Sequence, residues 1–177
     1  MSRVSCLVSR ISYLVSRVSN DKTTMPHPLL PAPGYFGIGI HQVKRAENVG
    51  ALWRSAYQLG AAFLFTIGER YKPQSSDVFK SWLRLPLFRY ASFEQMTETA
   101  AYSCQVVGVE MGGEPLPDFV HPERAVYILG AEDGGLPTEI AARCHHVVSI
   151  PAVRFASYNV AVAGTLIMYD RMIKHGR

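Results

Sequence analysis

Short apolar runs alternate with amphipathic segments along the chain from residue 35 onward. The apolar runs predict strands at 35–41, 62–67, 87–91, 105–110, 125–130 and 146–150. The segments between them predict helices at 48–60, 93–102, 137–143 and 157–174. Because strands and helices alternate, we expect an α/β fold in which a mostly parallel sheet carries helices on both faces.

Two of the predicted helices have faces that can be interpreted individually. In 48–60, the apolar stripe is formed by Val49, Leu52, Trp53 and Ala56, and the opposite face carries Gly50, Arg54 and Gln58. We expect Asn48 to cap this helix, which leaves the small Gly50 one turn before Arg54. The helix 157–174 is apolar nearly all round as far as Tyr169, so we expect it to be buried, with a second subunit as one candidate cover.

The N-terminal segment differs from the rest of the chain. A seven-residue repeat with serine and arginine fills residues 1–19, and prolines stand at 26, 28, 31 and 33. The repeat resembles an organelle transit peptide, but Met25 opens ordinary sequence, so we favour a translated repeat upstream of the true start. We therefore expect residues 1–33 to be a leader outside the fold, with 1–24 dispensable, and residues 34–177 to form one domain.

Composition and charge narrow the class of protein. The 177 residues are 48% hydrophobic and 18% charged, which is normal for a globular domain. The net charge is +4, of which +3 lies in residues 1–24, so total charge says little about a nucleic-acid partner. The uncharged apolar run 155–169 is too short for a membrane span, and we expect no membrane partner. Neither a disulfide framework nor a metal-binding spacing is present in the three cysteines, Cys6, Cys104 and Cys144, which favours a reducing, cytoplasmic setting and no metal.

Positive charge is concentrated locally between residues 70 and 89. Asp77 is the one acid in this stretch, whose basic residues are Arg70, Lys72, Lys80, Arg84 and Arg89. Aromatic residues lie between them: Tyr71, Phe79, Trp82 and Phe88. This mixture is typical of a surface that contacts phosphates and stacks on bases. An aromatic core with a solvated charged rim would have the same composition.

Candidate chemistry is concentrated at three predicted strand ends in the last third of the chain. Unusual loops begin there: VEMGGEPLP from 109, LGAEDGGLP from 129 and SIPAVRFASYN from 149. Ligands of parallel sheets bind beyond the carboxyl ends of the strands, so a site built from these loops is the first hypothesis. The second loop carries Gly134 beside Glu132 and Asp133, but it lacks the spacing of a phosphate loop or a dinucleotide fingerprint. An ordinary tight turn is the alternative for it.

Three segments taken together resemble the SpoU-type (TrmH-like) RNA 2′-O-ribose methyltransferases of the SPOUT class. The first motif, N-x-G-x₃-R-x-A, is matched by Asn48, Gly50, Arg54 and Ala56. The second, G-x-E-x-x-G-L, is matched by Gly130, Glu132, Gly135 and Leu136. The third is matched by Ile150, Pro151, Ser157, Asn159, Val160 and Ala163, with Tyr158 where the family usually has Leu or Met. The resemblance covers about residues 37–174.

The resemblance implies a fold and a chemistry that the residues alone do not show. It implies a C-terminal deep trefoil knot, a homodimer, and S-adenosylmethionine bound in a bent form by the knot loops. It also implies methyl transfer to a ribose 2′-hydroxyl of RNA. The implied catalytic residues are Arg54, acting across the dimer, with Glu132, Ser157 and Asn159. The implied cofactor-binding residues are Val109, Gly130, Gly135, Ile150 and Ser157.

Two alternatives stay open at the level of sequence. One is a non-catalytic RNA-binding relative, which the intact Arg54, Glu132, Ser157 and Asn159 disfavour. The other is base methylation, which would need an acid near the target nitrogen, and Asp133 or Glu110 could serve. Because the chain is small and shows no accessory RNA-binding domain, we favour tRNA over rRNA as the substrate.

Overall fold

A computed structural model of the chain describes residues 34–68, 83–100, 103–155 and 157–175. Its strands are β1 (Tyr35–His41), β2 (Phe63–Ile67), β3 (Leu87–Tyr90), β4 (Gln105–Pro115), β5 (Arg124–Leu129) and β6 (His146–Ser149). Its helices are α2 (Ala46–Gln58), α3 (Phe93–Thr99), α4 (Thr138–Ala141) and α5 (Val160–His175). The N-terminal repeat and residues 69–82 lie outside this description.

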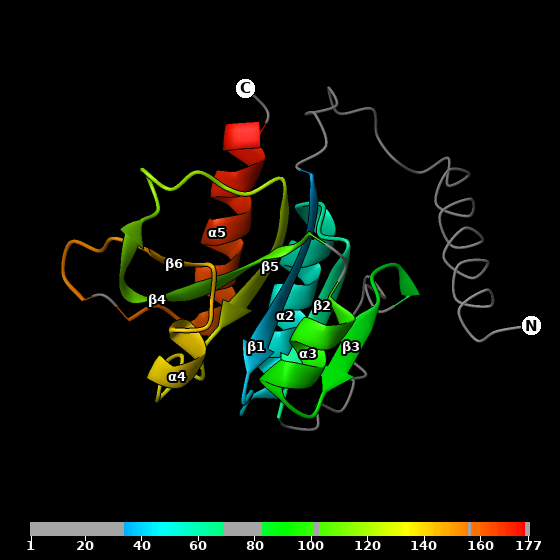
Figure 1. The fold of residues 1–177 in the computed structure, drawn as a ribbon. Coiled ribbons are helices and arrows are strands. Elements are labelled where there is room, and N and C mark those ends of the chain that lie inside the picture. The colour runs from blue at the N-terminus through cyan, green and yellow to red at the C-terminus, as the bar shows by residue number, and fades with distance from the viewer. Residues whose placement is uncertain (1–33, 69–82, 101–102, 156, 176–177) are drawn as a thin grey trace, which may run out of the picture.

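The six strands form one sheet in the order β3-β2-β1-β5-β4-β6, and every pair of neighbours is parallel (Figure 1). All carboxyl ends therefore lie along one edge of the sheet, and β1 and β5 end toward the bottom of Figure 1, where α4 also lies. Chain order reverses direction at β1, which pairs with β2 on one side and with β5 on the other. Such an edge is where parallel sheets bind their ligands.

Helices cover both faces of the sheet, as the sequence predicted. On one face α2 and α5 pack together, with Ile38, Leu52 and Ile167 in a shared core. The opposite face buries Phe65, Met96 and Ile140 beneath α3 and α4. The predicted stripe of α2 is buried, whereas Arg54 and Gln58 are exposed.

Glycine allows two close approaches in this core. A Cβ on Gly164 of α5 would lie 2.4 Å from Cδ1 of Leu52, so the small residue lets α5 pack directly against α2. On the other face, a Cβ on Gly39 would lie 2.4 Å from the ring of Phe65, so glycine lets this ring pack against β1. Any side chain at Gly164 or Gly39 would force these packed groups apart.

One predicted strand and one predicted helix have other bounds in the structure. Strand β4 continues to Pro115 through a register shift between Val109 and Glu114, because its end pairs again with β6. Helix α5 begins at Val160, three residues later than predicted. Its apolar surface is not covered all round, since Val162 and Tyr169 are 48% and 53% exposed.

Within the described residues, no helix combines the length and apolar character needed to cross a membrane.

A buried polar network closes the amino-terminal end of the sheet. Arg171 of α5 is fully buried and donates hydrogen bonds to the carbonyls of Pro122 and Glu123 and to the hydroxyl of Tyr127, over distances of 2.6–2.9 Å. Since the guanidinium can only donate, the Tyr127 proton is directed to Nδ1 of His121, 2.6 Å away. Nε2 of His121 then donates to Asp170 at 2.9 Å. Burial raises the pKa of Tyr127 to about 12 and lowers that of His121 to about 4.

Candidate functional site

A pocket of about 330 Å³ lies at the carboxyl edge of the sheet. It is formed by the ends of β4, β5 and β6, by the loops that follow them and by the start of α5. All five residues expected to bind a cofactor are in its lining: Val109, Gly130, Gly135, Ile150 and Ser157. The structure thus brings together the three loops that the sequence indicated, although they lie far apart along the chain.

Asn48 joins the three motifs at one point beside this pocket. It is buried in the first turn of α2, donates from Nδ2 to Oε1 of Glu132, and accepts at Oδ1 from Nδ2 of Asn159 at 3.0 Å. The expectation that Asn48 caps α2 is therefore wrong, because Arg45 holds the cap position and makes no side-chain capping bond. An amide offers a donor and an acceptor together, and here each binds a different loop.

The loop 130–136 is closed by its own backbone. Ala131 and Gly135 exchange two backbone hydrogen bonds of 3.0 and 3.1 Å, and Gly135 adopts a left-handed φ of 62°. A Cβ on Gly130 would lie 1.9 Å from the carbonyl carbon of Gly135, so a side chain is excluded there by the loop itself rather than by a ligand. Gly134, in contrast, lines the pocket and has open space where its Cβ would be.

Three carboxylates line the pocket, and each has a hydrogen-bond donor that holds its loop. Glu132 binds Asn48, Glu110 accepts from the backbone N–H groups of Leu136 and Met111, and Asp133 pairs with Lys44. The hydrogen bond and charge of Lys44 hold the pKa of Asp133 below its usual value. No lysine or arginine is among the described residues of the lining, so the pocket is acidic.

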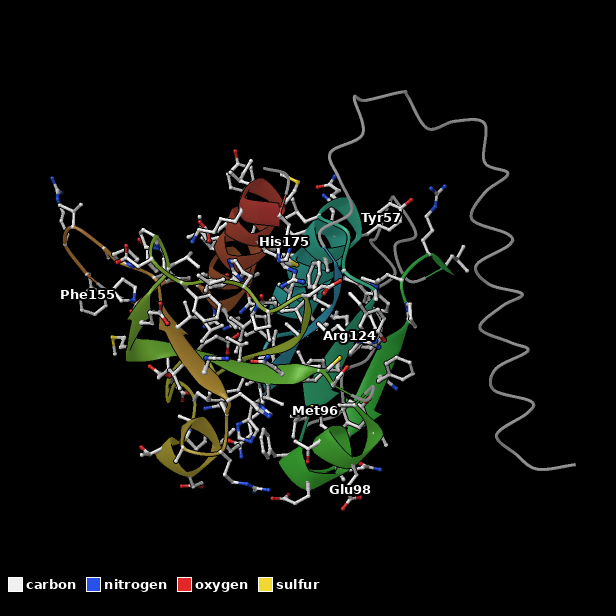
Figure 2. All side chains as sticks on the ribbon, turned by 45° about the horizontal axis from the view of Figure 1, so that its top comes forward. Tyr57, Met96, Glu98, Arg124, Phe155 and His175 are labelled. Atoms are coloured by element: carbon white, nitrogen blue, oxygen red, sulfur yellow. The ribbon has the colours of Figure 1, made fainter. Side chains whose placement is uncertain are left out.

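The third loop joins the pocket to α5. Asn159 is the cap of α5, since its Oδ1 accepts from the backbone N–H of Ala161 at 3.0 Å. Ser157 is exposed and lines the pocket. Tyr158 is not a simple apolar replacement, because its hydroxyl donates to the carbonyl of Pro151 at 3.0 Å. Phe155 is 78% exposed on a loop that extends outward from the molecule (Figure 2).

Arg54 lies apart from the other expected catalytic residues. It is exposed on the outer face of α2 and, among the described residues, is not part of the pocket lining. The structure therefore brings Glu132, Ser157 and Asn159 to one site in this chain and leaves Arg54 on the surface, outside the pocket lining. The action of Arg54 on the pocket of a second subunit stays a prediction.

The basic stretch is described only in part. Arg70, Lys72 and Lys80 lie outside the described residues. Arg84 donates to the Tyr57 hydroxyl at 2.8 Å with its guanidinium 5.6 Å from the ring centre, while Arg89 and Phe88 are exposed on β3. Stacking and positive charge thus occur together in the described part of this stretch.

The sequence did not predict the contacts that Asn48 and Lys44 make with the loop 130–136. The sequence signal for Asn48 was its place in the first motif, but its buried contacts depend on loops more than 80 positions away. The signal for Lys44 was weaker, namely a cation shortly before that motif.

Cys144 is no nucleophile candidate, because burial raises the pKa of its thiol to about 11.

The parallel sheet, the pocket at its carboxyl edge and the bridging amide define an α/β protein with a ligand site built from three loops. The sequence profile of the SpoU rRNA Methylase family matches residues 36–169. The chain therefore belongs to this family, and the resemblance seen in its three motifs is confirmed.

Known proteins of similar sequence or structure agree with this placement. The chain is 26% identical over 137 residues to the mouse (Mus musculus) tRNA (guanosine(18)-2′-O)-methyltransferase TARBP1, covering 72% of this chain but 9% of that protein. AviRb of Streptomyces viridochromogenes, a SpoU methyltransferase, is 27% identical with a TM-score of 0.72, covering 82% of this chain and 62% of AviRb. A structure described as giving insight into 2-OH methylation of C/U34 on tRNA is 27% identical with a TM-score of 0.71, covering 82% and 99%.

Proposed function

We propose that this chain is an S-adenosylmethionine-dependent RNA methyltransferase that acts on a ribose 2′-hydroxyl, with a tRNA as substrate. The observation that carries the proposal is the convergence of all three motifs on one pocket, joined by the buried amide of Asn48. We also propose that residues 34–177 form the catalytic domain. The C-terminal trefoil knot remains a prediction from the family.

The pocket fits S-adenosylmethionine in size and charge. Its volume of about 330 Å³ is within the range of small-molecule sites, and Leu129, Ile150 and Val160 supply apolar surface. The lining carboxylates favour a ligand that carries positive charge, as a sulfonium and an ammonium do. AviRb has been solved in complex with AdoMet, and that structure is 26% identical with a TM-score of 0.72. When bound, the cofactor would supply a methyl group activated for transfer to oxygen.

The residues of this chain would position the ribose and its proton. Asn48 holds the loops of Glu132 and Asn159 in fixed relation, so that oxygen, methyl and sulfur can be aligned. Ser157 is exposed at the pocket and can contact the cofactor or the target ribose. Arg54 would bind the RNA phosphate and help the hydroxyl lose its proton, because a guanidinium is a strong donor and a poor base.

Arg54 and the pocket would be completed by dimerisation. Tyr57 of α2 and Val162 and Tyr169 of α5 expose apolar surface on the two helices that pack together. We propose that this surface forms a homodimer in which each Arg54 serves the partner's pocket. Sedimentation should then show a dimer at micromolar concentration, and an active monomer would contradict this arrangement.

We also propose a tRNA substrate and a reducing compartment. The mouse relative and the structure concerned with C/U34 are both named for tRNA, which supports tRNA over rRNA. Arg84 and Arg89, together with Arg70, Lys72 and Lys80, are the proposed phosphate contacts. The unpaired thiols of Cys104 and Cys144 are consistent with a reducing compartment, and we propose the cytoplasm.

Base methylation is less well supported by the site. Asp133 is paired with Lys44, which lowers its pKa and makes it a weaker base. Glu110 already accepts the backbone N–H of Leu136, which holds the loop 130–136, and the backbone N–H of Met111. A purely RNA-binding role is disfavoured because the network around Asn48 is intact.

The decisive experiment removes Arg54. Arg54→Ala should lower methyl transfer to RNA at least about a hundredfold, because its contribution arises in the transition state, while cofactor affinity and folding stay unchanged. Arg54→Lys should be nearly as poor, since an ammonium does not reproduce the planar fork. Gln58→Ala is the control, because it removes an exposed side chain one turn along the same face. Wild-type rates in Arg54→Ala would contradict the mechanism.

A further inference from the structure

Lys44 stands in a short connection that is held at both ends. The connection runs from the end of β1 to the start of α2, and Val43 within it is buried in the core. Gln42 has a left-handed φ of 51°, which is uncommon for a residue other than glycine, and its N–H donates to the carbonyl of Ile67 at 2.7 Å. The backbone of Lys44 is therefore fixed, and its ammonium is offered from a defined place at the carboxyl edge.

The partner of Lys44 belongs to the pocket. Asp133 lines the pocket and pairs with Lys44 across the gap between the two loops, with side chains 64% and 51% exposed. The neighbouring Glu132 is bound by Asn48, so the connection before α2 and the first turn of α2 hold the same loop. Because the pair is exposed, it is weak and open to competition by other anions.

We propose that Lys44 is an RNA-phosphate contact that exchanges Asp133 for a substrate phosphate, and thereby couples RNA binding to cofactor binding. The inference rests on the proposed function, because it takes RNA as the polyanion that reaches this edge. Asp133 holds the ammonium while RNA is absent, and a phosphate takes its place when the target strand binds.

The exchange follows from charge at the edge of the pocket. A polyanion draws cations from weak surface pairs and releases its own counterions when a lysine binds. Once Lys44 turns to the phosphate, the charge of Asp133 is no longer compensated by that ammonium. The pocket then becomes more negative, so a cationic cofactor should bind more tightly when RNA is present. Because linkage is reciprocal, the cofactor should tighten RNA binding by the same factor.

The carboxylate of the cofactor is a second anion that Lys44 could bind in place of Asp133. Lys44 is not among the described residues that line the pocket, whereas Asp133 is, which favours a ligand outside the pocket. Cofactor affinity measured without RNA separates the two sources, because only a contact to the cofactor's carboxylate would be lost there in Lys44→Ala.

The test is a double-mutant cycle on the full chain. The affinity of an unmodified tRNA transcript pool is measured between 50 and 200 mM salt for the wild type, Lys44→Ala, Asp133→Asn and the double variant. Lys44→Ala should weaken binding about fivefold and reduce the slope of log affinity against log salt by about one. Asp133→Asn should tighten binding about threefold in the wild type and leave it unchanged in the Lys44→Ala background.

A matched ion pair controls for the general effect of charge. Arg143 and Glu94 form an exposed pair, with side chains 50% and 54% exposed, between the end of α4 and the start of α3. Glu94→Gln also removes one negative charge, but it should not tighten RNA binding by the factor seen for Asp133→Asn. Thermal unfolding of each variant checks that the fold is kept.

Three results would overturn the inference. Equal tightening by Asp133→Asn in the presence and absence of Lys44 would show a general field effect. Loss of cofactor affinity in Lys44→Ala without loss of RNA affinity would assign Lys44 to the cofactor. Unchanged RNA binding in Lys44→Ala would show a purely structural pair. Failure of the proposed function would give a different result. The wild type would then transfer no methyl group, while the RNA affinities of the four proteins would still show the expected ratios.

Discussion

Asn48 and Arg171 are both buried polar residues on the packed helices α2 and α5, but they lie at opposite ends of the sheet. Asn48 bridges Glu132 and Asn159, two residues of loops that border the pocket. Arg171 is fully buried and binds Tyr127 and two backbone carbonyls just before β5. The Asn48 network borders the pocket formed by the three motif loops, whereas the guanidinium of Arg171 packs against the ring of Phe36, 4.9 Å from the ring centre.

The difference shows how one fold separates stability from chemistry. At the amino end, removing Arg171 would leave buried acceptors without a donor, so this network should contribute mainly to the free energy of unfolding. At the carboxyl end, Asn48 holds loops whose other contacts are partly exposed, so its loss should disturb alignment more than folding. Variants at the two ends of the sheet test that separation.

The largest effect is expected at the amino end. Arg171→Leu should lower the free energy of unfolding by about 3 kcal/mol, because the Tyr127 hydroxyl and two carbonyls lose a charged donor inside the protein. Urea unfolding measures this change. Methyl transfer per folded molecule, assayed well below the unfolding midpoint, should be unchanged. A stable but inactive variant would remove the distinction between the two ends.

The matching change at the carboxyl end is Asn48→Ala. It should lower methyl transfer about thirtyfold, or about 2 kcal/mol in the transition state, because the loops of Glu132 and Asn159 lose their common partner. Steady-state kinetics measures the loss. Ser55→Ala is the control, since it removes another hydrogen bond between α2 and α5, from Thr165, at a distance of 2.8 Å. Similar kinetics in both variants would contradict a special role for Asn48.

Stability should depend on pH through His121. Its pKa of about 4 in the fold lies below the usual value of 6.5, so between these pH values the unfolded chain binds the proton and the folded chain does not. The free energy of unfolding should therefore fall by on the order of 2 kcal/mol as pH decreases from 6.5 to 4.

The variant His121→Gln should reduce this slope, because glutamine can accept from Tyr127 and donate to Asp170 without titrating. His41 and His175 keep part of the slope, since burial lowers the pKa of each. A slope that is unchanged in His121→Gln would show that the network does not set the acid limit. Denaturant titrations at several pH values provide the measurement.

The smallest effect is expected in the loop 130–136. Gly134→Val should weaken S-adenosylmethionine binding about tenfold, or 1.4 kcal/mol, without loss of stability, because its side chain would enter the pocket where no protein atom lies within 4 Å. Gly134→Ala should have a smaller effect. Gly130→Val should instead destabilise the fold, since its Cβ would meet Gly135. Calorimetry with unchanged affinity in Gly134→Val would place the cofactor elsewhere.

The sequence by itself determined the elements and the loops that matter. The run 35–41 coincides with β1, and the stripe of Val49, Leu52 and Trp53 is the buried face of α2. Local periodicity suffices for such features, because a strand or helix buries the face that its own residues define. The three motif loops were identified in the same way, from glycines and polar residues directly after apolar runs.

The tertiary structure alone decided which polar side chains meet. Asn48, read locally, is a plausible cap, yet its partners lie 84 and 111 positions away and replace that role. Arg171, read locally, is one more charge on the last turns of a helix, but the chain buries it against β5. Side-chain hydrogen bonds of this kind depend on the three-dimensional position of distant loops, and neither periodicity nor composition carries that information.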